Sequence, residues 1–201
     1  MQIAGGEPLA TLVCRTRAVA VCKLILATGL LMFLSVRSDG DDVESASEQS
    51  IKAAYLYRIA EYVEWPREVL QDPPAALTIG VLGADSLARE LEEMTSARRV
   101  QGRPIAVKRV RSGDSLGGIH VLFIAREQSG ALGRISVAAR QNSTLLVTDF
   151  EHALDMGSAI NFRPVDQRIR FEVSLDSADR SRLRLSSRLL AVAERVRPRT
   201  Q

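Results

Sequence analysis

Few residues in this 201-residue chain are of the types that perform catalysis or bind metal ions. The two histidines, His120 and His152, lie far apart and match no zinc-ligand spacing. Both cysteines, Cys14 and Cys22, lie near the N-terminus, and the chain has no G-x-S-x-G motif. We therefore expect no enzymatic activity, no metal and no cofactor. Because His120 lies inside an apolar run, it is expected to be a hydrogen-bonded core residue.

The polar residues best suited to binding lie in the segment RLRLSSRLL, near the C-terminus. Ser186 or Ser187 is expected at the N-terminus of a helix, where unpaired backbone N–H groups and the helix dipole favour an anion. Arg182 and Arg184 alternate onto the same side of the extended segment before that helix. These four residues predict a site for a small anion or acidic metabolite, and the alternative is a serine cap beside solvated arginines.

The stretch IKAAYLYRIAEYVEWP predicts a helix from about Ser50 to Trp65, because apolar residues recur in it at helical spacing. Lys52 falls within the apolar face of this helix, in its first turn. Pro66 prevents the helix from continuing. Trp65 lies away from the centre of the apolar face, so it either covers the core or anchors a partner.

Strands and helices alternate through the rest of the chain. The elements expected are a strand at 78–82, a helix at 86–95, strands at 103–112 and 119–125, a helix at 130–141, a strand at 143–149 and a final helix at about 187–196. The segments SAINFRP and RIRFEVSL predict a hairpin that turns through Val165, Asp166 and Gln167. This order predicts a single layered α/β domain, with a mostly parallel central sheet, an antiparallel C-terminal hairpin at its edge and flanking helices.

The hairpin also offers a candidate surface for a protein partner. Ile160 and Phe162 on one strand, and Ile169 and Phe171 on the next, supply more apolar side chains than one covered edge needs. We expect partner contacts at these four residues and at Trp65.

The N-terminal segment differs from the rest of the chain. Arg15, Arg17 and Lys23 precede the uncharged apolar run LILATGLLMFLSV, which is too short for a comfortable membrane span. This order is typical of a cleaved secretory signal, and an uncleaved N-terminal anchor is the alternative. The predicted organisation is a signal peptide over 1–38, a linker over 39–49 and one domain over 50–197.

The net charge of +3 belongs to the predicted leader. Residues 1–38 hold four Lys/Arg and one acid, which leaves 23 of the 27 basic and 23 of the 24 acidic residues in the remainder. The exported part is therefore neutral, and nothing in its composition suggests that it binds nucleic acid or an anionic membrane.

The segment from Lys52 to Pro66 resembles the K-A-x-x-L-x-x-F-x-x-Y-x-x-W-P motif at the start of the YfiR-like domain, with Ile59 where Phe is common. The later pieces LTIGVLG, IHVLFIA, TLLVTD, INF, IRFEVSLDSA and LRLSSRLLAVA follow in a similar order, so the resemblance covers about residues 50–196. It implies an exported α/β domain without enzymatic activity.

The resemblance also implies a function in signalling. The characterised type binds and represses the periplasmic sensor domain of an inner-membrane diguanylate cyclase, and so controls cyclic di-GMP and biofilm formation. An outer-membrane lipoprotein can sequester that repressor. For this chain, a second copy of itself, in a homodimer, is a further expected partner. The characterised type carries cysteines in its mature domain, whereas the exported part of this chain has none. The alternative function is a periplasmic module that binds a small anion or metabolite and feeds a sensor kinase or transporter.

Overall fold

The computed structural model describes residues 40–70 and 75–199 of the chain. Its contacts divide the chain into two units, 1–43 and 44–201, and every strand of the described residues belongs to the second. The predicted signal peptide lies outside the described residues. The predicted linker over 39–49 is helical from Gly40, where α2 (Gly40–Glu61) begins, so the opening helix starts well before Ser50. Glu and Ala in that segment are good helix formers, which lets the helix extend toward the N-terminus.

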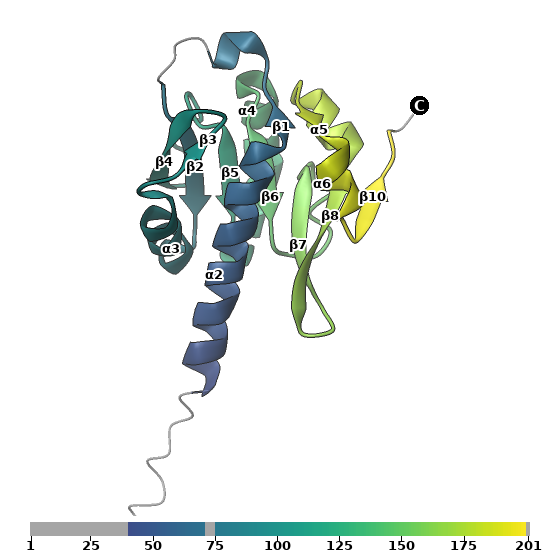
Figure 1. The fold of residues 1–201 in the computed structure, drawn as a ribbon. Coiled ribbons are helices and arrows are strands. Elements are labelled where there is room, and N and C mark those ends of the chain that lie inside the picture. The colour runs from purple at the N-terminus through teal and green to yellow at the C-terminus, as the bar shows by residue number, and fades with distance from the viewer. Residues whose placement is uncertain (1–39, 71–74, 200–201) are drawn as a thin grey trace, which may run out of the picture. The chain divides into compact units, whose positions relative to one another are not determined.

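The apolar face of α2 forms much of the core. Ala53, Leu56, Ile59 and Ala60 are fully or almost fully buried, and Tyr55 packs against them. Two short elements follow the helix, strand β1 (Val63–Glu64) and the 3₁₀ turn η2 (Arg67–Val69). The helix ends at Glu61, before the predicted end at Trp65, because Val63 and Glu64 pair with β9 (Arg184–Leu185) as strand β1, and its apolar face packs on the sheet (Figure 1).

The main sheet has the strand order β10-β8-β7-β6-β5-β2-β4-β3. Its strands are β2 (Leu77–Leu82), β3 (Arg99–Val100), β4 (Arg103–Val110), β5 (Val121–Ile124), β6 (Leu145–Thr148), β7 (Ile160–Val165), β8 (Arg168–Ser174) and β10 (Arg195–Arg197). Strands β4, β2, β5, β6 and β7 run parallel to one another. At the two sides of this group, β3 pairs antiparallel with β4 and β8 pairs antiparallel with β7, while β10 pairs parallel with β8. The predicted mostly parallel sheet with an antiparallel hairpin edge is confirmed.

The hairpin of β7 and β8 turns through two residues. Val165 pairs with Arg168, which leaves Asp166 and Gln167 in the turn, with φ of 48° and 58°. Two consecutive left-handed residues are typical of a type I′ turn, whose twist matches that of the flanking strands. The register places Arg163 opposite Arg170 and Asn161 opposite Glu172.

Helices cover both faces of the sheet. The larger core cluster joins α2 and α3 (Asp85–Thr95) to residues such as Val81, Phe123 and Phe162 of the strands. The smaller cluster joins α4 (Leu132–Asn142), which follows the 3₁₀ segment η3 (Arg126–Ala131), to Leu122 and Leu146 on the opposite sheet face. Figure 1 shows α2 in front of the sheet and α4 behind it.

The C-terminal region differs from the prediction of one long helix. After α5 (Leu175–Arg180), strand β9 (Arg184–Leu185) pairs antiparallel with β1 in a small separate sheet. The last helix, α6, spans only Ser187–Ala191, and the chain then forms β10. Val196 lies opposite Val173 of β8, so pairing to the sheet replaces the predicted continuation of the helix.

Candidate binding site at the carboxyl edge of the sheet

The parallel strands place their carboxyl ends at one edge of the sheet. The chain passes from β2 to β4 on one side of β2 and later to β5 on the other side, so the strand order reverses between β2 and β5. In open α/β sheets, ligands bind outside the carboxyl ends of the strands at such a reversal. Gly83 follows β2, Arg126 follows β5 closely, and Asp149 follows β6 directly.

Lys52 joins the opening helix to this edge. Its Nζ lies 2.6 Å from Oδ2 of Asp149 and 2.6 Å from Oε1 of Glu48, and the residue is only 6% exposed. A buried ammonium group needs such compensation, because it has lost its hydration. Lys52 therefore connects α2 to the end of β6 through its charged hydrogen bond with Asp149, while its contact with Glu48 lies within α2.

The pKa of Lys52 reflects a balance of opposing effects. Burial favours the neutral amine and lowers the pKa, but the hydrogen bonds and charges of Asp149 and Glu48 outweigh it. The net result is a pKa raised above the usual value of 10.5. Lys52 is therefore a structural cation near neutral pH and unsuited to act as a general base or nucleophile.

A cavity of about 470 Å³ lies beside the Lys52 pair. It falls in the size range of small-molecule sites. Basic and acidic groups line it in equal number, namely Lys52, Arg126 and Arg163 against Glu48, Glu127 and Asp149. One oxygen of Asp149, Oδ1, is buried and has no hydrogen-bond partner. The cavity is thus polar and close to charge balance.

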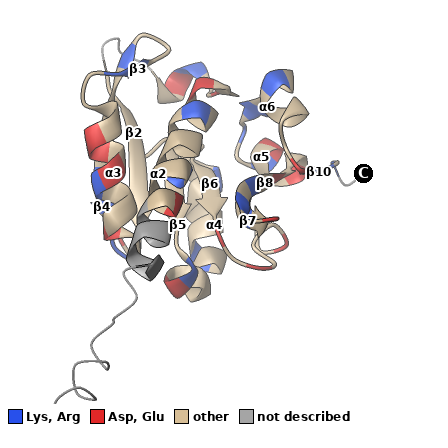
Figure 2. Ribbon diagram, turned by 60° about the horizontal axis from the view of Figure 1, so that its bottom comes forward, with Lys and Arg blue, Asp and Glu red and all other residues tan. Residues whose placement is uncertain are grey.

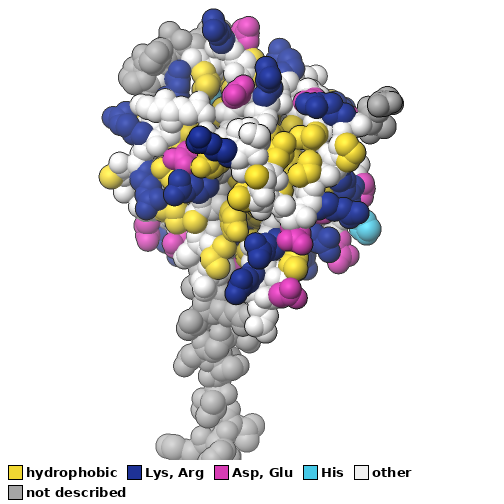
Figure 3. All heavy atoms as spheres, turned by 45° about the vertical axis from the view of Figure 1, so that its right-hand side comes forward, with side chains coloured by type: hydrophobic (Ala, Val, Ile, Leu, Met, Phe, Trp, Pro, Cys, Tyr) yellow, Lys and Arg dark blue, Asp and Glu magenta, His cyan; other side chains and the backbone are white. Residues whose placement is uncertain are grey.

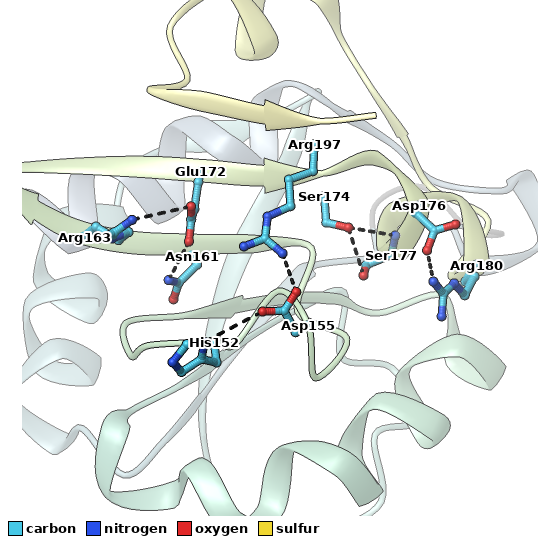
Figure 4. Close-up of polar contacts among 10 residues, drawn as sticks. All are labelled: His152, Asp155, Asn161, Arg163, Glu172, Ser174, Asp176, Ser177, Arg180 and Arg197. Atoms are coloured by element: carbon cyan, nitrogen blue, oxygen red, sulfur yellow. Dashed lines mark hydrogen bonds and ion pairs between the residues drawn. The ribbon is translucent and has the colours of Figure 1, made fainter. Parts of the chain in front are cut away.

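A chain of buried polar groups lies on the hairpin side of the same edge. Thr148 Oγ1 donates to Asn161 Oδ1 at 2.8 Å, and Asn161 Nδ2 donates to Glu172 Oε1 at 3.2 Å. Arg163 Nη1 approaches the other carboxylate oxygen of Glu172 at 3.8 Å (Figure 4). A cavity of about 490 Å³ lies over Asn161 and Glu172, and Arg126 and Asp149 line both this cavity and the first.

The residues predicted to contact a partner are mostly inside the core. Ile160, Phe162 and Phe171 are at most 2% exposed, and Trp65 is 7% exposed. Only Ile169 is half-buried and retains surface toward solvent. The hairpin packs most of its apolar face on α2, so these buried side chains serve the core. A direct contact between the folded domain and a partner stays a prediction for Ile169.

The four residues predicted to bind an anion lie at the start of α6 and in the segment before it, and they are exposed or half-buried. Ser186 caps α6, and its Oγ accepts from the backbone N–H of Leu189 at 3.3 Å, as a serine cap does. Arg182, Arg184 and Ser187 are exposed, and Arg184 lies 4.0 Å from Glu64. Anion binding here stays a prediction.

His120 is the hydrogen-bonded core histidine that the sequence predicts. Its Nδ1 accepts from the backbone N–H of Thr78 at 3.0 Å, and its ring packs edge-on against Trp65. Its pKa is lowered, first by burial and also by the charge of Arg103, while a hydrogen bond to the Val69 backbone opposes the shift. The imidazole is therefore neutral at pH 7, in a structural role.

This shift predicts a loss of stability in mild acid. The pKa of His120 is lower in the folded state than in the unfolded state. Its neutral form therefore stabilises the fold above about pH 6.5, and this contribution to the free energy of unfolding is lost as the pH falls. We expect the free energy of unfolding to fall between pH 7 and 5, by at most about 1.4 kcal/mol per pH unit from this group. Urea unfolding should show a flatter pH dependence for His120→Asn. An identical slope in both proteins would contradict the assignment.

Sequence reasoning missed Asp149 and Glu172. Asp149 follows the buried strand STLLVTD and looks like a loop residue, yet it is the partner of Lys52. The available signal was Lys52 itself, a charge on an apolar helix face that requires a buried carboxylate.

Within residues 40–70 and 75–199, no group of three or more His, Cys, Asp or Glu side chains is placed to hold a metal ion.

The fold and its edge cavities define an α/β domain of the layered, largely parallel class. More specifically, the family model described as YfiR/HmsC-like matches residues 49–194, so the chain belongs to that family. Among solved structures, a conserved domain protein from Vibrio cholerae O1 biovar El Tor strain N16961 is similar, with a TM-score of 0.51 and 13% identity over 72% of this chain. The chain spans 60% of that protein, and the likeness concerns the fold alone. No curated protein matches.

Proposed function

We propose that this protein is a periplasmic, non-enzymatic regulator that binds and represses the sensor domain of an inner-membrane diguanylate cyclase. It would thereby lower cyclic di-GMP and restrain biofilm formation. The observation that carries the proposal is membership of the YfiR/HmsC-like family across residues 49–194. The chemistry of the described residues agrees with it, since His120 and Lys52 have structural surroundings.

The proposed location is supported by the N-terminal sequence. The basic and apolar order of residues 15–36 supports export and cleavage. In the described part of the chain, no helix has the length and apolar character needed to cross a membrane. The mature N-terminus should fall between residues 38 and 47, which mass spectrometry of the periplasmic fraction would reveal.

Deletion of the gene is the direct test of repression. Cyclic di-GMP and biofilm should increase in the deletion strain, and expression of the chain from a plasmid should restore both to the parental level. The cyclase gene should be required, so the double deletion should show no increase. If cyclic di-GMP stays at the parental level in the single deletion, the protein does not repress a cyclase.

Exposed apolar side chains offer a way to separate binding from folding. Figure 3 shows hydrophobic side chains gathered on the side that carries the C-terminal elements, with basic side chains around them. Val192, at the end of α6, is 64% exposed, and Ile169, on β8, keeps part of its surface. Ile169→Asp or Val192→Asp should release the cyclase at unchanged protein level, whereas Val137→Asp, on α4, is a matched control.

The remaining partners stay predictions of the family resemblance. An outer-membrane lipoprotein would relieve repression by sequestering the protein, and a homodimer would be detected by light scattering on the purified protein.

The second candidate function is a periplasmic module that binds a small ligand and feeds a sensor kinase or transporter. Two cavities at the carboxyl edge, of about 470 and 490 Å³, favour this candidate.

A further inference from the structure

Positive charge is concentrated in the C-terminal part of a chain whose exported region is neutral. Residues 160–199 hold ten arginines and five acidic residues. Figure 2 shows Lys and Arg on β7, β8 and near α6. Composition averages this excess with the acidic excess of residues 39–159, so only the folded arrangement shows where the charge lies.

The pairing of three strands brings four of these arginines onto one sheet face. Arg163 on β7 lies directly opposite Arg170 on β8. Arg168 precedes Arg170 by two residues on β8, so it lies on the same face. Arg195 on β10 lies opposite Glu172 of β8, which shares that face. We call Arg163, Arg168, Arg170 and Arg195 the arginine face. All four are exposed.

The arginine face is poorly neutralised. The acidic residues beside it are Glu172, which is 7% exposed and held by Asn161, and Glu194 at the rim. Among the described residues, no carboxylate oxygen lies within 4.0 Å of Arg168, Arg170 or Arg195. Like charges directly opposite each other across two strands are destabilising. The pair of Arg163 and Arg170 therefore lowers the stability of the hairpin unless an anion lies between them.

The surface between these arginines is concave. A cavity of about 340 Å³ is lined by Arg163, Arg170 and Arg195, together with Val165, Phe171, Glu172 and Glu194. A cavity of this volume is of the size that binds small molecules, whereas a protein partner would need a broader and flatter surface. Guanidinium groups bind phosphate oxygens with paired, charge-assisted hydrogen bonds.

We propose that the arginine face binds a small phosphate-bearing ligand in this cavity, with Arg163, Arg170 and Arg195 as the donors. Two phosphate groups would neutralise more of the four guanidinium charges than one, so pyrophosphate is the better probe and orthophosphate the weaker one. This site is separate from the predicted anion site at Arg182, Arg184, Ser186 and Ser187. The inference does not depend on the identity of the partner protein.

The test is calorimetric titration of the protein purified from the periplasm with pyrophosphate, in chloride buffer of constant ionic strength. Arg170→Ala and Arg195→Ala should each weaken binding about tenfold or more, because each removes a charge-assisted donor. Arg182→Ala is the matched control, an exposed arginine outside the arginine face, and should bind as the parent does. Glycerol phosphate in place of pyrophosphate distinguishes a phosphate ester from the inorganic ion as the source.

A second variant separates loss of binding from loss of folding. Arg170→Glu places a carboxylate opposite Arg163, so the thermal midpoint without phosphate should rise while the stabilising effect of pyrophosphate disappears. The inference is overturned if the parent protein binds no pyrophosphate. It is equally overturned if binding is lost in Arg182→Ala or Arg184→Ala and kept in Arg170→Ala and Arg195→Ala. These measurements use no cyclase, so their failure would leave the proposed repression untouched.

Discussion

Phe162→Ala is expected to lower the free energy of unfolding by about 3 to 5 kcal/mol, which is the usual cost of removing a buried aromatic ring. Phe162 is 1% exposed and lies where α2 meets the hairpin. Its ring centroid is 5.8 Å from that of Tyr55 and 6.3 Å from that of Phe123. Truncation would leave a cavity between the opening helix and two strands. Urea unfolding followed by circular dichroism measures the change.

The matched control for Phe162→Ala is Val165→Ala on the same strand. Val165 is half-buried at the end of β7, so its truncation should cost less than about 1 kcal/mol. If Phe162→Ala lost no more stability than this control, Phe162 would not be a core residue. In a cell, repression lost by Phe162→Ala should accompany a fall in protein level, so this variant reports on folding rather than on a partner contact.

Asp149→Ala is expected to be the most damaging substitution at the carboxyl edge. It leaves the Lys52 ammonium buried with Glu48 as its one remaining carboxylate partner among the described residues. Removing one member of a buried ion pair typically costs about 3 kcal/mol or more, because the other charge stays desolvated. Chemical denaturation at pH 7 should show this loss, together with weaker attachment of α2.

Glu48→Ala is the control for Asp149→Ala. Glu48 is 43% exposed in its side chain, and exposed ion pairs contribute about 1 kcal/mol or less. The double variant Lys52→Met with Asp149→Leu should recover much of the stability, since it removes both charges at once. Equal losses for Asp149→Ala and Glu48→Ala would contradict the view that Asp149 is the main partner.

The charge on Lys52 also gives a pH dependence of known sign. Its folded pKa lies above the unfolded value of about 10.5, so its contribution is complete below that pH and is lost as the pH rises through the folded pKa. Acidification from pH 9 to 7 should therefore leave the Lys52 contribution unchanged. The acid-side change predicted for His120 is separate, which allows the two groups to be tested independently.

Hydrophobic patterns predicted most of the sheet. The apolar runs around Ile79, Val121 and Val147 became neighbouring parallel strands, and the turn at Asp166 and Gln167 closed the predicted hairpin. These features depend on residues close in sequence, whose spacing sets which face is buried. The end of α6 was predicted less well, because pairing of Val196 with β8 depends on a distant strand.

The sequence by itself placed Lys52 on the apolar face of a helix and His120 inside an apolar run, where a charge or an imidazole needs a compensating partner. Only the tertiary structure decided that Asp149 is that partner, since the two residues meet through packing of α2 against the end of β6. Strand register likewise decided that Arg163 and Arg170 face each other. A one-residue change of register would move every side chain of the strand to the other face, and the predicted turn through Val165, Asp166 and Gln167 left that register open.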